Sequence, residues 1–130
     1  MFKINPSDKQ KIGLKGEEVA ANYLKSQGFT IIGQNVWNKW GEIDLVAKQG
    51  SKWHFVEVKT VTRETFSRET EVFSPEDQLH PGKLRRLARS VEIYLLKNNL
   101  DEIDWQIDGL LVYLKPNRET LHVELVEDII

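Results

Sequence analysis

The chain of 130 residues contains no cysteine and no long apolar run, and each absence excludes a class of protein. Without cysteine it can form neither a disulfide nor a zinc–thiolate site, which fits the reducing cytoplasm where we expect the protein to work. No apolar stretch approaches the roughly 18 residues that span a bilayer, so no membrane partner is expected. The length and the 40% of hydrophobic residues are typical of one globular domain, which we assign to residues 1–130.

An excess of charge of one sign is also lacking, because the formal net charge is only −2. The charge is unevenly spread, however. Residues 98–130 contain eight acidic and two basic residues, a balance of −6, whereas residues 1–97 contain sixteen basic and twelve acidic residues, a balance of +4. Nucleic-acid binding depends on local patches rather than on the total charge. The net charge therefore leaves such binding open, and the acidic C-terminal part leaves open a protein–protein adaptor.

Hydrophobic periodicity predicts a mixed α/β domain with the order α-β-β-β-α-β-β. Gly28 suits the position just after a helix, and Gly50-Ser51 is typical of a two-residue hairpin turn. The predicted helices span about 8–27 and about 81–98, and the predicted strands span about 29–37, 42–48, 52–60, 105–114 and 120–126. Residues 61–80 have no clean period, although Ser74 to Asp77 resembles the start of a helix.

The predicted hairpin at residues 41–62 contains the residues best suited to chemistry. With the glycine turn at its tip, antiparallel pairing places Asp44 opposite Glu57 and, in the same register, Glu42 opposite Lys59. Cross-strand partners have Cβ atoms roughly 4.5–5.5 Å apart, where like charges are destabilising. A bound cation would relieve this repulsion, so the register predicts a metal site. The alternative is a solvated face on which Glu42 and Lys59 form a salt bridge.

Strand alternation and helix phase define this site further. Alternation places Asp44, Glu57 and Lys59 on one face of the sheet, and Ile43 on the opposite face with Leu45. Two carboxylates and a backbone carbonyl suffice as hard oxygen ligands for Mg²⁺.

The first helix offers a third carboxylate. Glu17 lies at the edge of its apolar face, whereas Glu18 points nearly opposite. Gly13 and Gly16 lie on the apolar face and predict close packing against a sheet, which would bring Glu17 toward the carboxylate pair. The alternative for Glu17 is a boundary residue paired with a lysine.

Several motifs follow one another along nearly the whole chain: Gly16-Glu17 with Ala20 and Tyr23-Leu24, Gly28-Phe29, Gly41-Glu42-Ile43-Asp44-Leu45-Val46, Phe55-Val56-Glu57-Val58-Lys59-Thr60, Lys83 with Arg86-Leu87-Ala88 and Tyr94-Leu95, and Ile107-Asp108. In order and spacing they resemble the YraN-like family of small bacterial proteins. That family is similar to archaeal Holliday-junction resolvases. The resemblance implies the restriction-endonuclease-like PD-(D/E)XK fold, a mixed sheet of about five strands flanked by helices.

The resemblance also implies roles for four residues. Asp44 matches the motif aspartate, Glu57 and Lys59 match the E-x-K pair, and Glu17 matches the helix-borne acid of the resolvase branch. Asp44, Glu57 and Glu17 would then hold Mg²⁺ or Mn²⁺, and Lys59 would orient a water or stabilise the transition state. The chain departs from the motif name at Ile43, which stands in place of the proline.

A basic group on the second predicted helix suits contact with phosphate. Its members are Lys83, Arg85, Arg86 and Arg89. The alternative is a solvated helix face with ordinary charges. The family often has an arginine directly after its Lys-Thr pair, where this chain has Val61, and Arg63 is the candidate substitute.

Aromatic and remaining polar residues are assigned mainly to structure. The four tryptophans are Trp37, Trp40, Trp53 and Trp105, which we interpret as core or rim anchors rather than base-stacking platforms. Trp40, next to the predicted site, is the exception to test. Asp108 is interpreted as a structural hydrogen-bonding residue in the sheet, and His54 as a packing or surface residue.

Together these observations predict a metal-dependent, structure-selective DNA endonuclease. Its expected cofactor is Mg²⁺ or Mn²⁺, its expected partner is branched or flapped DNA, and the resolvase relatives suggest a homodimer. The alternative from another class is a non-catalytic nucleic-acid-binding module on the same fold. The intact set of Asp44, Glu57 and Lys59 favours the enzyme.

Overall fold

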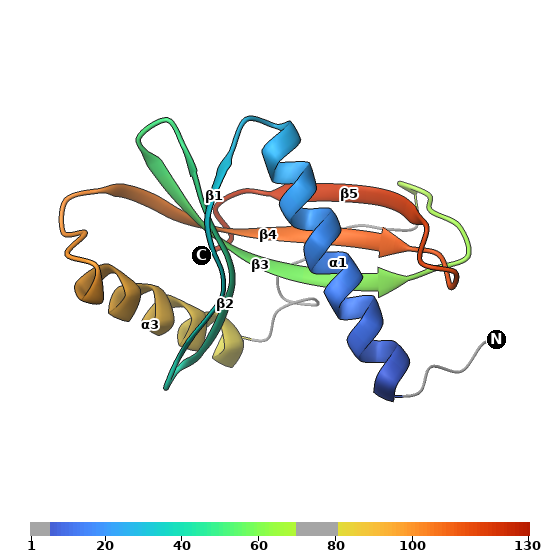
Figure 1. The fold of residues 1–130 in the computed structure, drawn as a ribbon, viewed down its shortest axis with the longest axis horizontal. Helices are drawn as coiled ribbons and strands as arrows, with labels where there is room; N and C mark the ends of the chain where they lie inside the picture. Colours follow the sequence, from blue (N-terminus) through green and yellow to red (C-terminus); the bar gives the residue numbers. More distant parts are fainter. Residues whose placement is uncertain (1–5, 70–80) are drawn as a thin grey trace.

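The computed structural model describes residues 6–69 and 81–130, and the order of their elements is the predicted one (Figure 1). The elements are α1 (Pro6–Ser26), β1 (Thr30–Asn38), β2 (Gly41–Gln49), β3 (Lys52–Thr62), α3 (Pro81–Lys97), β4 (Asp104–Leu114) and β5 (Thr120–Val126). The expected mixed α/β fold with a five-stranded sheet flanked by helices is thereby confirmed. The predicted helix start at Ser74 to Asp77 lies outside the described residues. No helix in the described ranges is long and apolar enough to cross a membrane.

Two glycines end their elements as the sequence predicts. Gly28 has a φ of +92°, and the amide of Phe29 donates to the carbonyl of Leu24 at 2.9 Å, which closes the last turn of α1. Gly50 has a φ of +61° in the turn between β2 and β3. These positions favour glycine because a side chain is strained at positive φ.

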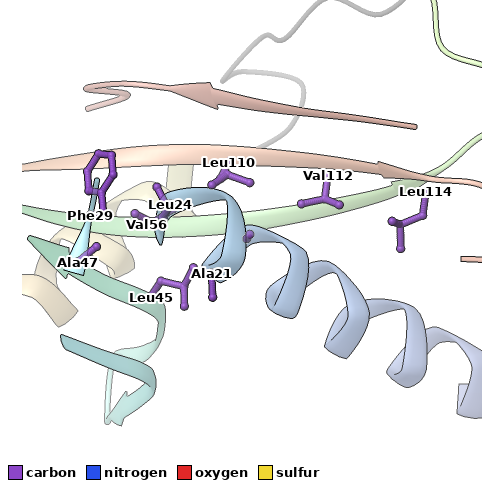
Figure 2. Close-up of a cluster of buried hydrophobic side chains, with 10 residues drawn as sticks. Ala21, Leu24, Phe29, Leu45, Ala47, Val56, Leu110, Val112 and Leu114 are labelled. Carbon is purple, nitrogen blue, oxygen red and sulfur yellow. The ribbon is translucent and has the colours of Figure 1, made fainter. Parts of the chain in front are cut away.

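The sheet has the strand order β1-β2-β3-β4-β5, and its two faces carry separate hydrophobic clusters. Strands β3 and β4 are parallel, and all other neighbours are antiparallel. On one face, Leu45, Val56 and Leu110 pack against Ala21 and Leu24 of α1 (Figure 2). On the other face, Phe55 and Ile107 pack against Leu87 and Val91 of α3. Because Phe55 and Val56 are consecutive in β3, the two helices cover opposite faces.

Strand β2 separates from β3 halfway along its length. The pairing runs from Gln49–Lys52 to Leu45–Val56, in the predicted register, and the described ladder ends there. Strand β2 then continues paired with β1 alone, as far as Asn38–Gly41. In Figure 1 the β1–β2 hairpin bends away from β3 and β4 toward α3. The separation creates a fork in the sheet, and Asp44 lies at its base.

Candidate metal centre

Three carboxylates from two elements come together at the fork. Glu17 of α1, and Glu42 and Asp44 of β2, each offer an oxygen atom within 4.8 Å of the others. We call these three residues the acidic cluster. Glu17 and Asp44 also line a cleft of about 510 Å³ together with Lys59 and Lys83. Helix phase thus correctly selected Glu17 over Glu18, whose carboxylate instead faces Lys15 at 3.7 Å.

At the fork, the side chain of Asp44 accepts a hydrogen bond from a backbone amide of β3 that has no partner in β2. Its Oδ2 accepts a hydrogen bond of 2.8 Å from the amide of Val58, a group that β2 no longer pairs. Burial, followed by the negative charge of Glu57, raises the pKa of Asp44 to about 8. The hydrogen bond from Val58 lowers this pKa, while the charges of Glu42 and Glu17 raise it further. A carboxylate in this setting is stabilised by any cation that enters the cluster.

The predicted pairing of Asp44 with Glu57 and of Glu42 with Lys59 is wrong. The described β2–β3 ladder stops one pair earlier, and Glu42 pairs with Trp37 of β1 instead. The predicted alternation also fails at Asp44. Ile43 packs in the cluster on the α3 face although Leu45 packs on the α1 face, so two residues separated by one lie on opposite faces.

Asn35 marks the irregularity that the sequence analysis did not recognise. It has a φ of +50°, and the β1–β2 register runs from Gln34–Leu45 to Val36–Ile43 without a pair between Asn35 and Asp44. Its amide nitrogen donates to Oε2 of Glu17 at 2.6 Å and also to Oε1 of Glu42. Asn35 therefore connects the α1 acid to the β2 acid. The available signal was that asparagine tolerates positive φ better than most residues.

Glu57 is close to the acidic cluster but has a different partner. Its carboxylate is almost completely buried and forms an ion pair with Lys83 of α3. It lines a pocket with Glu42, Lys83 and Arg86. Its negative charge is, after burial, the second cause of the raised pKa of Asp44. The role of Glu57 as a metal ligand stays a prediction, and Glu42 is the acid in the cluster that the sequence analysis did not select.

The predicted basic residues divide into three groups. Lys59 and Lys83 line the same cleft as Asp44, and Lys59 is exposed. Arg85, Arg86 and Arg89 line a groove beside Trp40, on the α3 side. Arg63 follows β3, where its Nη1 donates to the carbonyl oxygen of Thr62 at 2.9 Å.

A second cluster, outside the cleft, supports a structural role for Asp108. Asp108 is fully buried, and its Oδ2 lies 2.7 Å from Nδ1 of buried His54. Its Oδ1 accepts hydrogen bonds from the side chain of Gln106 at 2.7 Å and from the amide of Asp128 at 2.9 Å. The interpretation of Asp108 as a hydrogen-bonding residue of the sheet is thereby confirmed. Glu127 lies near enough to complete a potential ligand set, but both oxygens of Asp108 already have partners.

The acidic cluster fits a hard divalent cation. It provides three carboxylates and no sulfur or imidazole ligand, which is the donor chemistry of Mg²⁺ and Mn²⁺. In their present arrangement, Glu17 and Glu42 share a single amide group as donor. A divalent cation held by Glu17, Glu42 and Asp44 would offset two of the three negative charges of the ionised cluster.

Comparison with known proteins identifies the family of this chain. Residues 16–112 match the profile of the family described as Uncharacterised protein family UPF0102. A UPF0102 protein of Campylobacter fetus is 40% identical over 102 residues, which cover 77% of this chain and 81% of that protein. A UPF0102 protein of Shewanella sediminis is 43% identical over 91 residues, covering 70% and 73%. One from Neisseria gonorrhoeae is 38% identical over 102 residues, covering 78% and 84%. The chain therefore belongs to the UPF0102 family, the YraN-like family that its motifs resemble.

Proposed function

We propose that this protein is a metal-dependent, structure-selective DNA endonuclease, similar to Holliday-junction resolvases, that acts on branched or flapped DNA. The observation that carries the proposal is the acidic cluster of Glu17, Glu42 and Asp44, which borders a cleft that also contains Lys59 and Lys83. Carboxylates beside lysines suit a reaction on a phosphodiester, because the acids hold a cation and the lysines attract the phosphate. The likeness of the motifs to those of archaeal resolvases supports the same reaction.

The position of each group in the cleft suggests its chemical role. Bound Mg²⁺ or Mn²⁺ supplies a Lewis acid that neutralises charge on the phosphate and lowers the pKa of a water. Asp44 is held in place by the amide of Val58, and Glu17 and Glu42 by the amide of Asn35, so the oxygens are oriented before a ligand arrives. Lys59 lines the cleft, where its ammonium group would stabilise negative charge on the scissile phosphate.

A cleavage assay tests the proposal. Labelled four-way junction, flap, single-stranded and duplex DNA are incubated with Mg²⁺ or Mn²⁺ and with wild type, Asp44→Asn or Lys59→Gln. We expect the wild type to cleave junction or flap DNA and both variants to lose cleavage by at least about 100-fold, the usual effect of removing one electrostatic stabiliser. Glu18→Gln is the matched control, since Glu18 neighbours Glu17 in sequence but lies outside the cleft. Cleavage retained by Asp44→Asn would refute the assignment.

The non-catalytic nucleic-acid-binding module is distinguished by metal binding. If the acidic cluster holds a cation, Mg²⁺ or Mn²⁺ raises the melting temperature of the wild type but not of Asp44→Asn, because a ligand that binds only the folded state stabilises it. Calorimetric titration with the same metals gives an independent measure. DNA binding without any metal binding would favour the module.

A further inference from the structure

The cleft at the fork continues into a groove on the α3 side. A pocket beside the acidic cluster is lined by Glu42, Glu57, Lys83, Arg86 and Trp40. Trp40 and Arg86 also line a neighbouring groove of about 240 Å³, which is completed by Gly82, Arg85 and Arg89. We call the residues of this second hollow the Trp40 groove. Since the two hollows share residues, a ligand in the Trp40 groove can extend directly to the acids of the fork.

Trp40 is held in a defined position by the turn between β1 and β2. Its amide donates to Oδ1 of Asn38 at 2.8 Å, which fixes the turn locally. The side-chain Nδ2 of Asn38 donates to the backbone carbonyl of Ser90 at 3.2 Å. In return, the hydroxyl of Ser90 donates to Oδ1 of Asn38 at 3.2 Å. Because Ser90 is buried in α3, these bonds connect the turn to the helix that carries the arginines. The turn that carries Trp40 and the helix that carries the arginines are therefore fixed relative to each other.

Cations surround the indole ring of Trp40. The guanidinium carbon of Arg89 lies 5.2 Å from the ring centroid, and Nζ of Lys39 lies 5.5 Å from it. Arg85, Arg86 and Arg89 are exposed, and no acidic side chain in the described ranges lies within ion-pair distance of them. As exposed side chains they add positive charge to the groove. A positively charged groove with an aromatic ring is the arrangement by which proteins bind single-stranded nucleic acid.

We propose that the Trp40 groove binds an unpaired nucleotide, with the base stacked on the indole of Trp40 and the flanking phosphates bound by Arg86 and Arg89. The inference rests on the proposed function, which it deepens by naming an unpaired strand as the part of the substrate next to the cleavage site. The base displaces the exposed side chain of Lys39 from the ring, and the ammonium group stays near the phosphates. In duplex DNA the bases stay stacked on one another, so none of them can stack on the indole.

The test is a binding measurement in EDTA, where no cleavage takes place. Fluorescence anisotropy gives the dissociation constants of a labelled single-stranded oligothymidine and of a labelled duplex for wild type, Trp40→Ala and Trp40→Phe. We expect Trp40→Ala to weaken single-strand binding by roughly 5- to 100-fold, since one base–aromatic stack is lost. Trp40→Phe should restore most of this affinity, and the duplex affinity of Trp40→Ala should change by less than about threefold.

Trp37→Ala is the matched control, because Trp37 lies three residues away in β1 and is 70% exposed without lining the groove. It should bind the single strand as the wild type does. Equal binding by Trp40→Ala and wild type, equal losses on single strand and duplex, or no single-strand binding by the wild type would each overturn the inference. Near-ultraviolet circular dichroism checks that the variants are folded.

The outcomes for the groove and for the endonuclease are separable. Trp40-dependent binding in EDTA, combined with no cleavage in Mg²⁺ or Mn²⁺, would support the groove and refute the proposed function. Metal-dependent cleavage that needs Asp44, combined with single-strand binding that does not need Trp40, would refute the groove and leave the endonuclease intact.

Discussion

Two clusters with acidic side chains lie in the same sheet, and they differ in how their charges are compensated. Around Asp108, both carboxylate oxygens have partners: His54 on one, Gln106 and the amide of Asp128 on the other. In the acidic cluster at the fork, three carboxylates share the amide of Asn35 and the backbone amide of Val58. The first cluster contains a basic residue, whereas the second gathers like charges.

The difference is the one expected between a structural polar group and the metal site that we propose at the fork. A buried carboxylate that is fully hydrogen-bonded specifies one packing arrangement and gains little from a cation. Carboxylates that raise the pKa of their neighbour repel it when it is ionised, and a bound cation would relieve this repulsion. We therefore assign a structural role to the Asp108 cluster and keep the proposed metal binding for the acidic cluster, although each holds three potential ligands.

The strongest test of the comparison is Asp108→Ala. Removing one member of a buried hydrogen-bonded group typically costs about 1–3 kcal/mol for each donor that stays buried without a partner. We expect a loss of this size in urea unfolding at pH 7, with no change in the rise of melting temperature caused by Mg²⁺. A loss below about 1 kcal/mol would remove the structural assignment of the Asp108 cluster.

The second test uses the pKa of Asp44, which is raised from 3.8 to about 8 in the folded protein. Between these values the folded state holds more protons than the unfolded state, so its stability falls as pH rises and is lowest above about pH 8. We expect a fall on the order of 3 kcal/mol in EDTA. In Asp44→Asn, the neutral amide can still accept the bond from Val58, and the fall should be much smaller. Urea unfolding from pH 4 to pH 9 measures both curves, and parallel curves would contradict the raised pKa.

The third test concerns the contact that brings Glu17 to the fork. A methyl group on Gly16 would come 1.8 Å from Oγ1 of Thr60, so either Thr60 or α1 must shift in Gly16→Ala. We expect a loss of about 1–3 kcal/mol in urea unfolding and weaker metal binding by calorimetry. Gly13→Ala is the matched control, because nothing lies within 4 Å of the added methyl group. It should be neutral or stabilising, since alanine favours a helix. Similar losses in both variants would show that close packing at residue 16 does not position Glu17.

The smallest effect is expected for Lys83→Gln. Lys83 is half-exposed, so solvent screens its ion pair with Glu57, and a glutamine at this position can still donate a hydrogen bond to that carboxylate. The substitution should therefore cost only about 1 kcal/mol. The remaining carboxylate of Glu57 then lacks its cation, and the stabilisation by Mg²⁺ should increase. Thermal melts with and without Mg²⁺ measure both effects, with Lys97→Gln at the other end of α3 as the control. An unchanged response to Mg²⁺ would indicate that Glu57 and the metal do not interact.

Local signals in the sequence predicted the fold well, because they act over a few residues. Gly28 and Gly50 need positive φ, and each ends an element where predicted. The register of the hairpin also followed correctly from its turn, as far as Leu45–Val56. The prediction that α1 packs closely against the sheet is confirmed at Gly16 but is wrong at Gly13, which has open space around it.

The site was predicted only in part, because strand alternation assumes an uninterrupted ladder. The positive φ of Asn35 interrupts β1, and the third strand β3 separates from β2 at the same level. From that point on, cross-strand counting assigns the wrong partner to Asp44 and overlooks Glu42. An irregularity of this kind depends on how two strands bend together, which the pattern of a single strand does not reveal.

The parallel pairing of β3 and β4 has a consequence for the order of folding. Its register joins Lys52 to Asp104 and continues to Thr62–Leu114, so each partner lies about fifty residues away along the chain. The β1–β2–β3 meander needs only two tight turns. Contacts between distant residues form slowly, because a long loop must close first. We expect the meander with Glu42, Asp44 and Glu57 to form early, and α3 with its arginines to arrive later, when β4 joins the sheet.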